Sequence, residues 1–203
     1  MTERTWSRIE DARERWNVLR HPFYRRWSAG ELSAADLACY SGQYRHAVEA
    51  VATLSDSVAD SAPERPELGR HAEEERDHVA LWDGFVEAAG GTPGAEPTAE
   101  TTACVREWTD GGAGLPERLI TLYAIESGQP EISRTKLEGL LGSYGFEDGP
   151  ATEYFRVHER RDVEHAAEAR ELVDEVAEPA DEDRLVAAAE AAFRANWRLL
   201  DGV

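Results

Sequence analysis

The chain has 203 residues, enough for one domain with a sizeable apolar core, and we expect a single domain over residues 1–203. Its 41 acidic against 22 basic residues give a formal net charge of −19, which disfavours nucleic acid and anionic membranes as partners. No segment approaches the roughly 18 apolar residues of a membrane helix, and the N-terminus has no apolar signal core. These features predict a cytoplasmic protein.

Every regular segment of the chain reads as helix, and no convincing alternating strand or repeat is present. Ser33 with Asp36 resembles a capping box, Pro66 suits a first helical position, and Gly90-Gly91 and Asp110–Gly114 are breaks. The sequence therefore predicts an all-α bundle with its chemistry between facing helices. The expected helices cover residues 4–19, 21–27 (followed by a turn at 28–32), 33–60, 66–89, 98–109, 116–127, 130–144, 150–177 and 181–200.

The helix expected at 150–177 carries three polar residues in its apolar stripe. His158, Asp162 and His165 lie between Phe155 and Ala169 in steps of three and four, the spacing of a buried helical seam. A buried carboxylate and two imidazoles are costly unless they are paired or bound to a cation. The pattern predicts metal ligands.

Two more helices show the same interruption of an apolar stripe. Glu75 and His78 form Glu-x-x-His in the stripe that also holds His71, and Glu126 is the charged residue in the stripe of the helix at 116–127. Taken alone, a Glu-x-x-His in so charged a chain is more often a solvated face. Glu74, four residues before His78, could serve in place of Glu75.

Together the three helices offer three carboxylates and three histidines as predicted ligands: Glu75, His78, Glu126, His158, Asp162 and His165. Three carboxylates nearly balance two divalent cations, and helix-bundle di-iron proteins use such ligands from facing helices. Mixed oxygen and nitrogen ligands with open positions suit Fe(II) or Mn(II) in oxygen chemistry. We therefore expect two Fe(II) ions, or a Mn/Fe pair, with O2 as co-substrate. Tyr123, Tyr44, Trp82 and His71 are further candidates for the pocket lining.

Lys136 is the single lysine in a chain whose other basic residues are arginines. A lysine can lose its proton on burial, whereas an arginine cannot, so Lys136 is a candidate for a proton-transfer role. An acidic chain with lysine nearly eliminated also resembles halophilic proteins. The two cysteines, Cys39 and Cys104, form neither a disulfide framework nor a thiolate metal site.

Several stretches resemble the haem-oxygenase-like di-iron oxidases and oxygenases, the iron-containing redox enzyme branch of the superfamily of thiaminase II and the pyrroloquinoline-quinone synthesis protein C. The stretches are His21-Pro-Phe-Tyr24, Trp27-Ser-Ala-Gly30, Gln43-Tyr44, Leu81-Trp82 and, most specifically, Tyr123-Ala-Ile-Glu126-Ser-Gly-Gln129-Pro130. The resemblance covers nearly the whole chain. It implies a haem-oxygenase-like bundle of about seven to nine helices, and its ligand pattern falls on the six residues listed above. Members of one type separate the first Glu and His more widely, which leaves Glu74 and Glu75 both open.

Members of this branch that form para-aminobenzoate consume their own tyrosine and need a lysine. The resemblance places Tyr24 and Lys136 at those two positions as catalytic candidates. It implies an oxidoreductase acting with O2 on a small-molecule substrate or its own tyrosine, with an electron donor, and is compatible with a homodimer. The alternative is a metal-free protein of cofactor metabolism similar to thiaminase II or the quinone-synthesis oxidase. Thiaminase II needs a pocket cysteine, and residues 115–130 contain none.

Overall fold

The computed structural model describes residues 1–110 and 114–203, and these residues form helices without any strand. The predicted break at Asp110–Gly114 includes residues 111–113 and so lies partly outside the described residues. The helices are α1 (Glu3–Arg15), α2 (Pro22–Ala29), α3 (Ala34–Ser61), α4 (Pro66–Ala88), α5 (Ala99–Asp110), α6 (Leu115–Glu126), α7 (Gln129–Gly142), α8 (Pro150–Val176) and α9 (Glu182–Leu199), with short 3-10 turns at Val18–Arg20, Pro179–Asp181 and Leu200–Gly202.

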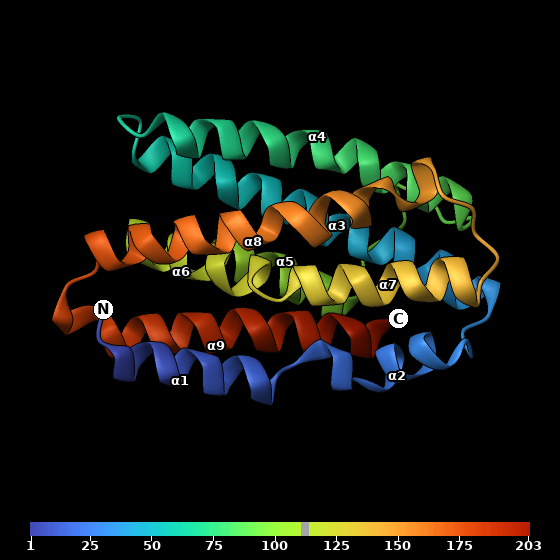
Figure 1. The fold of residues 1–203 in the computed structure, drawn as a ribbon, viewed down its shortest axis with the longest axis horizontal. Helices are drawn as coiled ribbons and strands as arrows, with labels where there is room; N and C mark the ends of the chain where they lie inside the picture. The colour runs from blue at the N-terminus through green and yellow to red at the C-terminus, as the bar shows by residue number, and fades with distance from the viewer. Residues whose placement is uncertain (111–113) are drawn as a thin grey trace.

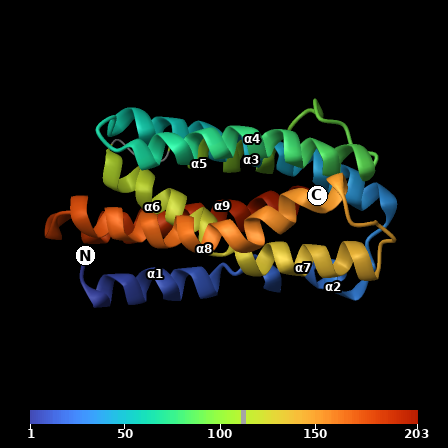
Figure 2. The same ribbon diagram turned by 45° about the horizontal axis from the view of Figure 1, so that its top comes forward.

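Helix α8 lies at the middle of the bundle. It packs against α4, α6 and α7, while α9 packs against α1, α5 and α6 (Figures 1 and 2). Helix α3 runs antiparallel beside α4, joined by a short turn, as such connections favour. The three helices that carry the predicted ligands therefore meet around α8.

Local sequence signals set several helix ends. The Ser33 side chain accepts from the backbone N–H of Asp36 and the Asp36 carboxylate accepts from that of Ser33, so the predicted capping box at the start of α3 is confirmed. Gly30 and Gly90 adopt φ of 70°, a left-handed conformation that glycine reaches without a steric penalty. These two glycines follow the last turns of α2 and α4. Helix α2 ends at Ala29, two residues beyond the predicted helix end at residue 27.

The first helix is shorter than predicted. The sequence predicts it over residues 4–19, but α1 ends at Arg15 and a 3-10 turn follows. Asn17 causes the break, because its side chain accepts a hydrogen bond from the backbone N–H of Leu19 at 3.0 Å and so competes with the helical pattern.

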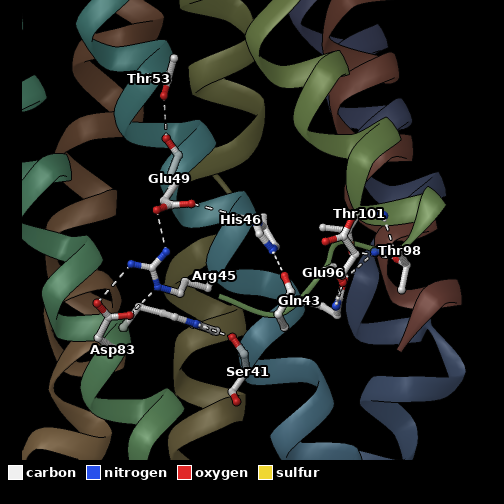
Figure 3. A network of polar contacts seen from close by, with 12 residues as sticks. Ser41, Gln43, Arg45, His46, Glu49, Thr53, Asp83, Glu96, Thr98 and Thr101 are labelled. Carbon is white, nitrogen blue, oxygen red and sulfur yellow. Dashed lines mark hydrogen bonds and ion pairs between the residues drawn. The ribbon is translucent and has the colours of Figure 1, made fainter. Parts of the chain in front are cut away.

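A polar network joins α3 to α4 and to the loop before α5 (Figure 3). Arg45 on α3 donates from Nε to Asp83 of α4 at 2.5 Å and from Nη1 to Glu49 at 2.6 Å. Gln43 donates to the carbonyl of Glu96 at 2.9 Å (Figure 3). These contacts fix the register of α4, and with it the positions of the candidate ligands that α4 carries.

None of the helices within residues 1–110 and 114–203 combines the length and apolarity that a membrane span needs.

Candidate metal centre

Helix α8 places its three predicted ligands on one buried face. His158, Asp162 and His165 are 3%, 1% and 4% exposed, as the seam spacing predicts. The His158 Nδ1 lies 2.7 Å from the carbonyl of Tyr154, one turn earlier, so Nδ1 carries the proton and Nε2 keeps its lone pair. A backbone carbonyl fixing one imidazole nitrogen while the other is free is the usual arrangement of a metal-binding histidine.

Helix α4 brings Glu75 and His78 to α8. Both are buried, at 3% and 5% exposure, and His78 Nδ1 lies 3.0 Å from Glu75 Oε1. The rings of His78 and His158 are 4.4 Å apart between centroids. Glu75, His78 and His158 can therefore offer ligand atoms to one common point.

A second group forms around Glu126, the last residue of α6. Its Oε1 lies 2.8 Å from His71 Nε2, without the alignment of a hydrogen bond, and the rings of His71 and His165 are 4.1 Å apart. His71, Glu75, Glu126 and His165 can likewise offer atoms to one point, and all four are buried. Glu75 belongs to both groups, which makes it the candidate for a shared ligand.

Asp162 lies beside the second group, with its Oδ1 3.6 Å from His165 Nδ1. Burial raises the pKa of this carboxyl to about 7, with the charges of Glu126 and Glu75 adding to the effect and the nearby His165 imidazole opposing it. A bound cation would offset the cost of keeping the Asp162 carboxylate ionised in the core.

Glu74, the alternative to Glu75, points to the surface. Arg161 Nη2 lies 2.8 Å from each of its carboxylate oxygens, and its side chain is 37% exposed. Its Oε2 is 3.3 Å from His165 Nε2. Glu74 therefore contacts the centre from outside, at a cleft of about 80 Å³ that His71, His165 and Arg161 also line.

The chemistry of the buried donors fits metal ions. Among the described residues, six buried atoms of this centre make no hydrogen bond: both oxygens of Glu126, both oxygens of Asp162, His71 Nε2 and His165 Nδ1. Buried polar atoms are rarely left without a partner. The two groups together supply carboxylate oxygens and imidazole nitrogens, the ligands of iron in helix bundles.

Protonation of the imidazoles follows their neighbours. Burial lowers the pKa of His158 to about 3, so this ring is neutral and free to bind a cation. Burial also lowers the pKa of His71, but the neighbouring Glu126 and Glu75 carboxylates together outweigh it and raise the value to about 11. Burial opposes the ionised form of Glu75, but the nearby His71 imidazole and the hydrogen bond with His78 outweigh it and hold the pKa of Glu75 well below the usual range.

Lys136 lies inside the bundle on α7. It is 0% exposed, its Nζ has no hydrogen-bond partner, and it stands 4.6 Å from the ring centre of Tyr44 and 5.2 Å from that of Trp82. Burial lowers the pKa of its amine to about 7. Lys136 is therefore buried, as its candidate role in proton transfer requires, and an amine with a pKa near 7 can exchange a proton near neutral pH.

Tyr24 on α2 is connected to the centre by aromatic contacts. Its Oη lies 3.3 Å from Tyr40 Oη, and Tyr40 packs edge-on against Trp82 at 6.0 Å. Trp82 contacts Tyr154 at 4.8 Å, and Tyr154 stacks on the candidate ligand His158 at 3.8 Å. Tyr24 thus stands at the far end of a continuous row of rings that reaches the centre.

Tyr123, one of the predicted lining residues, faces elsewhere. Its hydroxyl donates to Glu10 of α1 at 2.6 Å, and its ring packs edge-on against Trp6. A cavity of about 120 Å³ lies in the same part of the bundle, between α1, α6 and α9, and no candidate ligand lines it.

The fold places the chain among helical proteins with the haem-oxygenase architecture. A haem-oxygenase-like domain from Shewanella denitrificans superposes with a TM-score of 0.80 at 20% identity, covering 95% of this chain and 88% of that one. A TenA homologue from P. horikoshii gives a TM-score of 0.76 at 17% identity and covers 96% of each chain. At these identities the likeness shows the fold, and it confirms the predicted fold class.

The sequence comparisons then define the family. The model of the iron-containing redox enzymes matches residues 34–197, and the chain belongs to this family. It is similar to 4-aminobenzoate synthases from Nitrosomonas europaea and Chlamydia trachomatis, at 30% identity each, which cover 92% and 91% of this chain and 85% of each relative. The chain is thus an oxidoreductase of the iron-containing redox enzyme family, and the comparison favours this assignment over the metal-free alternative.

Proposed function

We propose that this protein is a di-iron enzyme that uses O2 to oxidise a small organic molecule or its own Tyr24, with 4-aminobenzoate as the product of the latter reaction and a primary amine as the source of its nitrogen. The observation that carries the proposal is the pair of buried ligand groups that share Glu75, on helices α4, α6 and α8. The names of the relatives in Nitrosomonas and Chlamydia support the product.

The six predicted ligands would hold the metal pair. His78 and His158 would bind one ion, Glu126, Asp162 and His165 the other, and Glu75 could reach both. Two Fe(II) ions, when bound, would supply electrons for the reduction of O2. A Mn/Fe pair is the alternative composition that the same donors accept, and a reductant would be needed to restore the metals for each further turnover.

Lys136 and Tyr24 would act as proton and redox groups of this chain. The amine of Lys136, with its pKa lowered to about 7 by burial, can deliver a proton at Nζ without help from solvent. The Tyr24 hydroxyl lies against that of Tyr40, and burial holds the pKa of both phenols well above the usual value, so both keep their protons in the resting protein. Oxidation of Tyr24 would therefore release a proton, and the Tyr40 hydroxyl is the adjacent hydrogen-bond partner that could pass it on by giving up its own proton.

The cysteines give no support to a thiaminase-like reaction. Cys39 is exposed on α3, and burial raises the pKa of the Cys104 thiol on α5, which keeps that thiol protonated. Neither of them is among the residues of the buried ligand groups.

The test is a single turnover with the iron-loaded protein. Protein loaded anaerobically with Fe(II) is mixed with O2, and products are read by mass spectrometry, both as free 4-aminobenzoate and as a mass loss at the Tyr24 peptide. We expect 4-aminobenzoate from the wild type and none from Tyr24→Phe, with Tyr123→Phe as the matched control that retains the product. Release of 4-aminobenzoate by Tyr24→Phe would contradict the assignment of Tyr24. If the wild type consumes no O2, the proposed function fails.

A further inference from the structure

We propose that His71 is itself a metal ligand, so that the centre holds four histidines, and that it biases its metal position toward Fe(II) over Mn(II). The inference rests on the proposed di-metal function and adds a seventh ligand to it. His71 is one turn before Glu75 on α4 and is 8% exposed.

The position of the imidazole is the first argument. His71 Nε2 lies 2.8 Å from Glu126 Oε1 and 3.7 Å from Glu75 Oε1, and its ring is 4.1 Å from that of His165. The nitrogen thus points at two carboxylates and lies beside a second imidazole, which are the surroundings of a ligand nitrogen. A histidine that only lined the substrate pocket would not need two carboxylates and a second imidazole beside its Nε2.

The composition of the two groups is the second argument. With His71 included, one group contains His71, Glu126 and His165, the other contains His78 and His158, and Glu75 belongs to both. Each metal position then has two imidazoles and a share of the same carboxylate. Without His71, the group around Glu126 would keep His165 as its one nitrogen donor among the described residues.

A plain ion pair explains the same residues less well. A protonated His71 between Glu75 and Glu126 would neutralise charge, but His71 Nε2 and both oxygens of Glu126 still make no aligned hydrogen bond. Buried ion pairs are stable only when such bonds satisfy the remaining donors and acceptors. A cation between these atoms would satisfy them together, and binding would displace the proton from His71.

The donor type then bears on the choice of metal. Imidazole nitrogen suits iron, whereas carboxylate oxygen suits manganese, and Fe(II) binds a given site of mixed donors more tightly than Mn(II). Replacing His71 by glutamate exchanges a nitrogen donor for an oxygen donor at nearly the same place. The variant His71→Glu should therefore keep two ions but accept a larger share of manganese.

The experiment is competitive loading of the full chain. Wild type, His71→Ala and His71→Glu are incubated anaerobically with equal amounts of Fe(II) and Mn(II), desalted, and counted by elemental mass spectrometry. The matched control is His46→Ala, because His46 on α3 contacts the carbonyl of Ala95 and none of the candidate ligands. Circular dichroism melting of each metal-free variant checks that the fold is retained.

We expect about two ions per chain in wild type and His46→Ala, and about one in His71→Ala, as loss of one ligand weakens one of two positions. His71→Glu should hold about two ions with a manganese-to-iron ratio raised at least about fivefold, the direction set by donor type. This variant keeps the test valid if His71→Ala does not fold. Two ions at wild-type affinity in His71→Ala, or an unchanged metal ratio in His71→Glu, would overturn the inference.

Failure of the proposed function gives a different result. A wild type that binds two ions, loses one in His71→Ala and still does not consume O2 would refute the proposed function and leave His71 as a ligand. A wild type that binds no metal would refute both.

Discussion

Replacing Lys136 with methionine is expected to stabilise the metal-free protein, by an amount that depends on pH. The amine is fully buried without a hydrogen-bond partner, and burial lowers its pKa from 10.5 to about 7. Between about pH 7 and pH 10.5 the unfolded chain therefore keeps the proton on the Lys136 amine, whereas the folded protein tends to lose it. The destabilisation is complete below a pH of about 7 and disappears as the pH rises toward 10.5.

The size of the effect follows from the same two values. Each pH unit between them is worth about 1.4 kcal/mol, which gives a destabilisation of about 4 kcal/mol at pH 7 and about 2 kcal/mol at pH 9. Methionine has a similar length and no charge, so it fills the space between Tyr44 and Trp82 without this cost.

The assay is urea denaturation of the metal-free wild type, Lys136→Met and Lys136→Arg at pH 7 and pH 9. The difference in unfolding free energy between variant and wild type cancels the contributions of all other titrating groups. Lys136→Met should be more stable at pH 7, and its advantage should shrink by about half at pH 9. Lys136→Arg should be less stable than wild type at both, because a guanidinium keeps its charge when buried. A pH-independent difference, or a less stable Lys136→Met, would refute the reasoning.

Two other predictions concern the ligands and the surface. Glu75→Ala should lose iron and Glu74→Ala should keep it, because Glu75 is buried in both ligand groups whereas Arg161 holds Glu74 at the surface. Counting iron ions per chain tests this prediction, and the reverse result would make Glu74 the ligand. The melting temperature should rise between 0.1 M and 1 M salt, because the net charge of −19 repels itself less as the Debye length falls from about 10 Å to about 3 Å. A melting temperature that does not change with salt would mean that local pairs already balance the surface charge.

Helical spacing allowed the buried ligand residues to be predicted. His158, Asp162 and His165 interrupt an apolar stripe at steps of three and four, and a stripe in a bundle helix faces the core, where the structure places them. The composition likewise singled out Lys136, since a lone lysine in an arginine-rich chain is conspicuous without any coordinates. Both signals depend only on nearby residues or on composition, so they can be recognised without knowledge of the tertiary structure.

The role of His71 could not be predicted from its spacing. The stripe through Glu75 and His78 indicated that His71 is buried, but not that Nε2 points at Glu126. That contact depends on how α4 and α6 both pack around α8, a long-range arrangement that no single stripe encodes. The surface position of Glu74 is similar, because it depends on Arg161 from α8.

The early end of α1 has a different cause. The sequence predicts one helix to residue 19, whereas α1 ends at Arg15. The side chain of Asn17 offers the backbone of Leu19 another partner, and this short-range competition ended the helix at Arg15.

Helices α4, α6 and α8 are proposed to form one centre for two metal ions. Anaerobic titration of the full chain with Fe(II), followed by elemental analysis of the desalted protein, tests it most directly. We expect about two iron ions per chain in the wild type and clearly fewer in His158→Ala, Asp162→Ala and Glu126→Ala, while circular dichroism shows that each variant keeps its fold. Full iron occupancy in all three variants, or no iron in the wild type, would contradict it.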